Sequence, residues 1–197
     1  MEEIWAIILA AGESKRMGVP KMLLPFDGST MIEKVISNVT ESKVSKIIVV
    51  LGPGGETLIE KIGKLGVLYC YNDNYKDGML SSVKCGFDNL PSDYKAVLVF
   101  QGDQPLISPD VINSVIDTYK SSGKGLVIPV YKGRRGHPLL IDLKYRHEIE
   151  KITPDEGLHS LQSKFKDDVQ DVSTNEPGIL RDFDTFDEYN KGINQIQ

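Results

Sequence analysis

The chain has 197 residues and a formal net charge of −5 at pH 7. Its 40% hydrophobic and 26% charged residues are a balance typical of a globular protein. At this length we expect a single domain over residues 1–197. The acidic balance argues against nucleic acid as the main partner, because binding to a phosphate backbone requires a basic surface. No apolar run approaches the roughly 20 residues that cross a bilayer, and Met1-Glu2-Glu3 lacks the basic segment of a signal peptide, so we expect a cytoplasmic protein that does not engage a membrane.

Apolar runs alternate with segments of helical period over the first two thirds of the chain. This alternation indicates βαβ units and a mainly parallel sheet of the doubly wound α/β type. The expected buried strands are Trp5–Ala10, Lys46–Leu51, Val67–Tyr71, Ala96–Gln101 and Gly125–Tyr131. The expected helices are Met31–Val39, which begins at a capping box formed by Ser29 or Thr30 with Glu33, then Glu56–Lys64, Met79–Leu90 and Pro109–Ser121.

The pattern changes after Tyr131. The stretch KGRRGHPLLID places a glycine-rich turn before a short apolar run, which predicts a small hairpin at the edge of the sheet. Two weaker helices are expected near Leu143–Lys151 and Glu156–Gln162. A last strand-like piece at Ile179–Phe183 leads into a terminal helix.

In an open parallel sheet, ligands bind beyond the carboxyl ends of the strands. The first such loop reads LAAGESKRMGVPKMLLP and fits neither the Walker A pattern nor the dinucleotide fingerprint. The small side chains of Ala10, Ala11 and Gly12 leave backbone N–H groups open to a ligand. Because Pro20 favours extended backbone before it, we expect an extended arm that carries Lys21 back to the site, where Lys21 and Arg16 could grip a triphosphate from two sides. The alternative is an ordinary solvated loop.

Two acidic residues follow apolar runs elsewhere in the chain. Asp103 comes directly after the strand VLVFQ, and Asp184 follows Ile179–Phe183. Mg²⁺ prefers one or two carboxylates together with substrate phosphates and water, so these two acids could hold it. The alternatives are that Asp103 is a turn former and that Asp184 caps the last helix with Thr185.

Four motifs in order, LAAGESKRMGVPKMLLP, GDQP, RGHPLL and DFDT, carry a resemblance that covers nearly the whole chain. The chain resembles the nucleotidyltransferases that attach a nucleotide to the molybdenum cofactor, and most of all their CTP-using subgroup, the molybdenum cofactor cytidylyltransferases. The resemblance implies a three-layer α/β/α, Rossmann-like nucleotidyltransferase fold of the nucleotide-diphospho-sugar transferase type, with a mainly parallel sheet and a small hairpin insertion.

The resemblance also implies roles for individual residues. Lys21, Arg16 and Asp103 would be catalytic, and Asp103 and Asp184 would hold Mg²⁺. The nucleotide-binding residues would be Leu9, Ala10, Ala11, Gly12, Arg16, Lys21 and Gly78 with Ser81 or Ser82. The acceptor would lie at Gly136, His137 and Pro138, where His137 binds rather than transfers a proton, unless it is only a histidine fixed in a turn.

The implied reaction is the transfer of CMP from CTP to the terminal phosphate of molybdopterin or molybdenum cofactor, with release of pyrophosphate. The terminal phosphate attacks the α-phosphorus in line, and positioning with charge neutralisation does most of the work. A molybdenum hydroxylase apoenzyme is an expected recipient of the product. The alternatives are a guanylyl- or cytidylyltransferase for another phosphorylated acceptor, and a noncatalytic cofactor-binding chaperone for such a hydroxylase.

Overall fold

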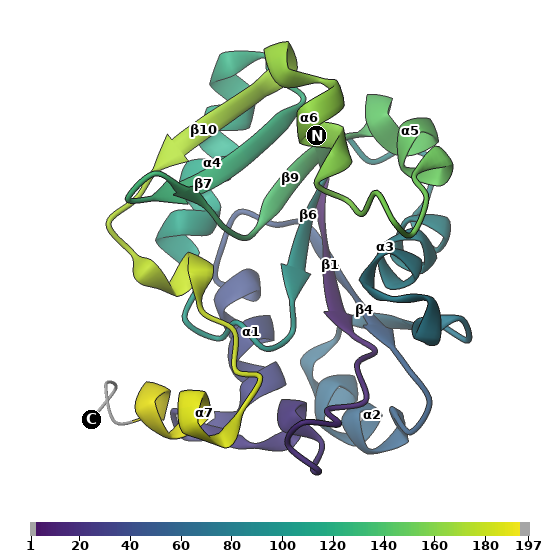
Figure 1. Ribbon diagram of the computed structural model, residues 1–197, viewed down its shortest axis with the longest axis vertical. Coiled ribbons are helices and arrows are strands. Elements are labelled where there is room, and N and C mark those ends of the chain that lie inside the picture. Colours follow the sequence, from purple (N-terminus) through teal and green to yellow (C-terminus); the bar gives the residue numbers. More distant parts are fainter. Residues whose placement is uncertain (1–2, 194–197) are drawn as a thin grey trace.

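The computed structural model describes residues 3–193, which form one large mixed sheet with helices on both faces (Figure 1). The strand order is β10-β7-β9-β6-β1-β4-β5, with β8 paired to β7 beside this row. The strands are β1 (Ile4–Ala10), β4 (Lys46–Leu51), β5 (Leu68–Tyr71), β6 (Ala96–Gln101), β7 (Leu126–Tyr131), β8 (Arg134–Arg135), β9 (Leu139–Asp142) and β10 (Val169–Ser173). A separate two-stranded ribbon joins β2 (Pro25–Phe26) and β3 (Ser29–Thr30).

The centre of the sheet is parallel, as the sequence predicts. β1 lies between β4 and β6, and both pairs run parallel. Every residue of β1 is buried, because helices cover both of its faces. All five predicted strands are present, with bounds that differ by no more than one residue.

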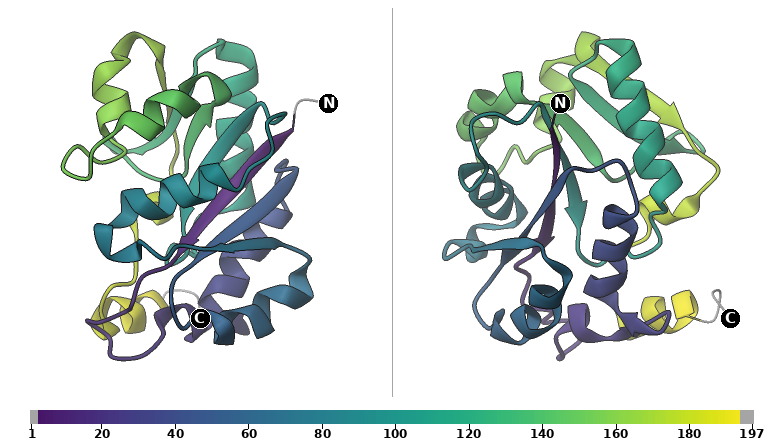
Figure 2. Two further views of the ribbon diagram at one scale, coloured as in Figure 1. Left: turned by 90° about the vertical axis from the view of Figure 1, so that its right-hand side faces the viewer. Right: turned by 180° about the vertical axis from the view of Figure 1, so that it is seen from behind.

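Helices of the two covering layers pack on opposite sides of β1 (Figure 2). One layer holds α1 (Met31–Thr40), α2 (Glu56–Ile62) and α4 (Pro109–Ser122), and the other holds α3 (Met79–Asp88), α5 (Arg146–Lys151) and α6 (Ser160–Lys164). Ile4, Ala6 and Ile8 face the first layer, while Trp5, Ile7 and Leu9 face the second. This is the predicted three-layer α/β/α fold.

Helix α1 begins as the sequence predicts, with Thr30 as the capping residue. The Glu33 carboxylate accepts from the Thr30 backbone N–H at 2.9 Å, and both halves of the capping box are present. The remaining helix, α7 (Phe186–Ile193), lies beside the loop that follows β1. Single 3-10 turns occupy Lys21–Leu23, Gly63–Leu65, Tyr75–Asp77, Leu143–Tyr145, Lys166–Asp168 and Pro177–Leu180. No helix within residues 3–193 has the length and apolar character needed to cross a bilayer.

The hairpin predicted at the edge of the sheet lies in its interior instead. β9 runs antiparallel between β6 and β7, and only the short β8 pairs with β7 outside that row. Leu139, Leu140 and Ile141 are all buried, as expected for a strand that is covered on both faces rather than alternately exposed. The insertion therefore parts the parallel strands β6 and β7.

The end of the chain contains two further corrections. Ile179–Phe183 is not a strand: its first residues belong to the 3-10 turn that begins at Pro177, and the Ile179 carbonyl accepts from His137 N–H at 3.0 Å. The sequence analysis also missed the strand β10, which pairs parallel with β7 at the edge of the sheet, and the short ribbon of β2 and β3. The helix expected at Glu156–Gln162 starts only at Ser160, because Gly157 adopts a left-handed turn with φ +62°.

Close packing of α3 on β1 yields a test of the fold. A Cβ at Gly86 would lie 2.7 Å from Ile7 Cγ2, whereas a Cβ at Gly63 would meet nothing within 4 Å. We expect Gly86→Ala to lower the free energy of unfolding, because an overpacking cost of about 1–3 kcal/mol exceeds the helix-propensity gain of about 1 kcal/mol. Gly63→Ala is the matched control and should be neutral or slightly stabilising. Urea unfolding of both variants measures this difference. Equal free energies of unfolding for Gly86→Ala and Gly63→Ala would contradict the close packing of α3 on β1.

Candidate active site

The predicted nucleotide loop borders a cavity at the carboxyl ends of β1, β5 and β6. Its volume is about 300 Å³. The lining residues are Leu9, Ala11, Gly12, Lys21, Met22, Tyr75, Gly78, Met79, Ser82, Gln101 and Asp103. Seven of these residues were candidate site residues in the sequence. They come from the ends of three different strands and the segments that follow them, and the fold brings these segments together around one hollow.

A second hollow of about 280 Å³ adjoins the first and is more strongly charged. It is lined by Gly12, Glu13, Ser14, Lys15, Arg16, Lys21 and Asp184. Gly12 and Lys21 belong to both hollows, so a single elongated ligand could lie across them. Ala10 borders neither and lines a smaller hollow against the loop after β4.

Lys21 forms the centre of the site. Its Nζ lies 2.5 Å from Asp103 Oδ2 and 2.8 Å from Asp184 Oδ1, and the three side chains are only 12%, 8% and 26% exposed. Burial lowers the pKa of Lys21, but the two carboxylates outweigh burial and hold the pKa above its ordinary value. The hydrogen bond from Lys21 in turn lowers the pKa of Asp184. The two acids are thus neither a free turn former nor a helix cap.

The N-terminal cap of α7 is supplied by another residue. Thr185 Oγ1 accepts from Glu188 N–H at 3.2 Å, and the Glu188 carboxylate accepts from Thr185 N–H at 2.9 Å. The Asp184 side chain is therefore directed to the site. Arg16 reaches it from the solvent side with a contact of 2.8 Å and is itself 71% exposed.

The arm that carries Lys21 differs from the prediction. Lys21 opens a single 3-10 turn at Lys21–Leu23 rather than lying on an extended stretch. Pro20 is extended, but its carbonyl accepts from Leu23 N–H at 2.9 Å and closes the turn. Ser14 secures the start of this turn, since its Oγ accepts from Lys21 N–H at 3.1 Å.

The two carboxylates fit the requirements of a divalent cation. Asp103 and Asp184 already share one cation, the Lys21 ammonium, and their oxygens are the ligand type that Mg²⁺ and Mn²⁺ prefer. Within residues 3–193 no three acidic, histidine or cysteine side chains gather into a ready metal cluster. A metal held by Asp103 and Asp184 would therefore take its other ligands from water and substrate phosphates, as Mg²⁺ commonly does.

Directly before β9, His137 contacts a residue that the sequence analysis missed. His137 Nε2 lies 2.8 Å from Gln101 Nε2. Burial lowers the pKa of His137, so the ring is neutral and accepts from the Gln101 amide at Nε2. Gln101 lines the first hollow, whereas Gly136 and Pro138 do not; Gly136 packs against Ile179, whose carbonyl a Cβ would approach to 2.3 Å. The position of Gln101, two residues before Asp103 at the end of β6, was the available signal.

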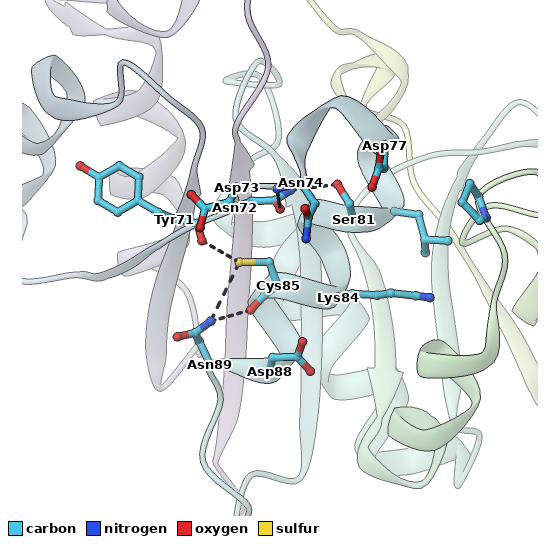
Figure 3. A pocket seen from close by; sticks show the side chains of 12 residues that line it. Tyr71, Asn72, Asp73, Asn74, Asp77, Ser81, Lys84, Cys85, Asp88 and Asn89 are labelled. Carbon is cyan, nitrogen blue, oxygen red and sulfur yellow. Dashed lines mark hydrogen bonds between the residues drawn. The ribbon is translucent and has the colours of Figure 1, made fainter.

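Ser81 and Ser82, which the sequence could not separate, face different hollows. Ser82 is 5% exposed and lines the first hollow. Ser81 lines a polar hollow of about 450 Å³ on the other side of α3, together with Asn72, Lys84 and Asn89 (Figure 3). Asn72 was not a candidate in the sequence, yet its side chain contacts both serines.

A nucleotidyltransferase positions a nucleoside triphosphate and neutralises its charge, and the cations and carboxylates at this edge of the sheet are groups suited to that work. The chain falls in that class. It belongs to the family of the MobA-like NTP transferase domain, whose sequence model matches residues 6–169. The resemblance seen in the four motifs is thereby confirmed at the level of the family.

Curated relatives and solved structures agree with this placement. The chain is 28% identical over 190 residues to a molybdenum cofactor cytidylyltransferase of Escherichia coli K12, an alignment that covers 96% of this chain and 95% of the relative. It is 34% identical over 120 residues to the bifunctional protein GlmU of Clostridium acetobutylicum, covering 60% of this chain but only 26% of that protein.

Two solved structures share the fold at low identity. A nucleotidyl transferase from Methanothermobacter superposes with a TM-score of 0.85 at 22% identity, covering 99% of this chain and 98% of its own. Rv0371c of Mycobacterium tuberculosis H37Rv, solved as a complex with manganese, superposes with a TM-score of 0.82 at 21% identity, covering 98% of both chains.

The Lys21 bridge makes stability depend on acid pH. Because the folded-state pKa of Asp184 is lowered, its contribution is complete above the ordinary pKa and is lost as the pH falls through the lower folded value. We expect the wild-type free energy of unfolding to drop below about pH 4, and Lys21→Met to flatten that drop, because protonation then relieves repulsion between Asp103 and Asp184.

Urea unfolding between about pH 3 and about pH 7 measures this difference. Lys34→Met is the matched control, because Lys34 pairs with Asp27 at the surface, 2.7 Å away. In this control the free energy of unfolding should depend on pH as it does in the wild type. The same pH dependence of the free energy of unfolding in all three proteins would show that Lys21 does not stabilise the charged Asp184 carboxylate.

Proposed function

We propose that the protein transfers CMP from CTP to the terminal phosphate of molybdopterin or molybdenum cofactor and releases pyrophosphate. The observation that carries this proposal is the Lys21 ammonium, held by Asp103 and Asp184 where the two hollows meet. The family supports nucleotidyl transfer. The choice of CTP and molybdopterin rests on the similarity to the Escherichia coli cytidylyltransferase over nearly its whole length.

The nucleoside would occupy the first hollow and the phosphates the second. Leu9, Ala11 and Gly12 would line the base and ribose from one wall, and Gly78 with Ser82 would form the opposite wall. The methyl group of Ala11 narrows the hollow and suits the smaller base of a pyrimidine nucleotide. Ala10 and Ser81 lie behind these walls and would support binding indirectly.

The cations would act on the phosphates. Lys21 lines both hollows, so its ammonium can turn from the carboxylates toward a bound triphosphate, while Arg16 approaches from solvent. Both would take up negative charge that grows on the leaving pyrophosphate. Asp103 and Asp184 would hold Mg²⁺, which when bound neutralises phosphate oxygens and favours in-line displacement.

The acceptor would approach from the side of β9. His137, between Gly136 and Pro138, fixes Gln101 through the 2.8 Å contact, and the Gln101 amide borders the hollow next to Asp103. A neutral His137 is suited to hydrogen bonding and adds no charge. A phosphate monoester already carries a nucleophilic oxygen near neutral pH, so no protein base is needed.

Pyrophosphate release tests the proposal directly. With Mg²⁺, molybdopterin or its molybdenum form, and either CTP or GTP, we expect release with CTP and little with GTP. Release with GTP alone would overturn the choice of nucleotide. No release with either nucleotide would favour a chaperone that hands cofactor to a molybdenum hydroxylase.

Removal of the central cation should cost more than removal of a surface cation. We expect Lys21→Ala to lower the rate of pyrophosphate release by about 10²–10³-fold, as when one preorganised donor to a developing oxyanion is lost. Lys34→Ala removes an equal charge from the surface pair with Asp27 and should leave the rate unchanged. Circular dichroism at the assay temperature confirms that both variants are folded. Near-normal turnover of Lys21→Ala would exclude this role.

A further inference from the structure

Asn72 is buried between the two hollows that flank α3. The residue is 4% exposed, and its backbone N–H donates to the Leu51 carbonyl at 2.8 Å, which fixes it at the end of β5 (Figure 3). Its Oδ1 accepts from Asn74 N–H at 2.9 Å. Because a backbone N–H can only donate, this contact settles the orientation of the amide: the oxygen faces Asn74 and the nitrogen faces the serines.

The amide nitrogen uses both of its protons on neighbouring serines. Nδ2 lies 2.9 Å from Ser81 Oγ and 3.0 Å from Ser82 Oγ. Both serine oxygens are therefore acceptors, and each hydroxyl must direct its own proton elsewhere. Ser81 donates its proton to the Gly78 carbonyl at 2.8 Å.

Ser82 differs from Ser81 in where its proton can go. Among residues 3–193, no carbonyl or carboxylate accepts from Ser82 Oγ, and this side chain lines the hollow with Gly12 and Lys21. Its hydroxyl proton is thus available to a ligand in that hollow. A ligand atom that pairs with it must be an acceptor, such as a ring nitrogen or a carbonyl oxygen of a nucleobase.

We infer that Asn72 is a positioning residue for nucleotide recognition: it keeps Ser82 as a donor toward the base. This inference rests on the proposed function, since it takes the first hollow as the nucleoside site. Asn72 does not touch the ligand. It donates to one lone pair of the Ser82 oxygen and cannot accept the hydroxyl proton there, so that this proton stays free for the ligand.

The substitution Asn72→Asp reverses this arrangement with little change in shape. The carboxylate keeps an oxygen for Asn74 N–H, but it accepts where the amide donated, so the Ser82 hydroxyl turns toward it and the hollow loses its donor. We expect the dissociation constant of CTP, measured calorimetrically with Mg²⁺, to rise about tenfold or more. The KM for CTP should rise similarly, with kcat nearly unchanged.

A double-mutant cycle separates positioning from a structural role. Ser82→Ala should weaken CTP binding as much as Asn72→Asp does, and the double variant should bind no worse than either. Asn72→Ala repeats the test if Asn72→Asp does not fold, with a smaller effect of the same sign. Wild-type CTP affinity in Asn72→Asp, or fully additive losses in the double variant, would overturn the inference.

Asn89→Asp is the matched control. Asn89 lines the same polar hollow and donates to the Cys85 carbonyl at 2.9 Å, so the substitution adds the same charge beside α3 without reaching the serines. It should leave the CTP affinity unchanged, and an equal loss there would overturn the inference. If wild-type protein binds CTP but releases no pyrophosphate, the proposed reaction fails while the binding cycle still decides the role of Asn72.

Discussion

The site depends on one ammonium group shared by two carboxylates. Lys21 comes from the loop after β1, Asp103 from the end of β6 and Asp184 from the segment before α7, so the contact joins three parts of the chain at one point. A buried charge with its partner removed is costly, which means that none of the three can change alone without a penalty. The same charges would bind a triphosphate and a divalent cation. The residues that hold these three segments together would therefore also bind the ligand.

The sheet places two different structural environments on opposite sides of this charge. On one side, the parallel strands β1 and β5 bring open backbone and α3 together around the first hollow. On the other, the antiparallel β9 parts β6 from β7 and brings His137 to Gln101. A fold of purely parallel strands would have left β6 next to β7. The inserted strand therefore supplies the contact between His137 and Gln101 on this side of the site.

Much of this architecture could be predicted from the sequence, since strands buried on both faces appear as unbroken apolar runs and their polar ends converge at one edge. The prediction of an edge position for β9 was wrong because it relied on the turn before the strand. Leu139–Ile141 is apolar on both faces, and such a strand lies in the interior of the sheet. β10 was missed because an edge strand tolerates residues such as Gln170 and Asp171 that blur the alternation. Ile179–Phe183 looked like a strand because it is an apolar run, but it joins no ladder: Ile179 packs in the core between the sheet and the first helix layer, and Phe183 packs beside α7.

The bridge from Lys21 to Asp184 spans 163 positions of sequence. Closing a loop of this length before the sheet has formed would carry an entropy cost with little contact energy to offset it, so we expect the sheet to assemble before the charges meet. During synthesis, Asp184 also leaves the ribosome after every strand of the sheet. A nascent chain thus holds Lys21 and Asp103 before Asp184 is available to complete the bridge.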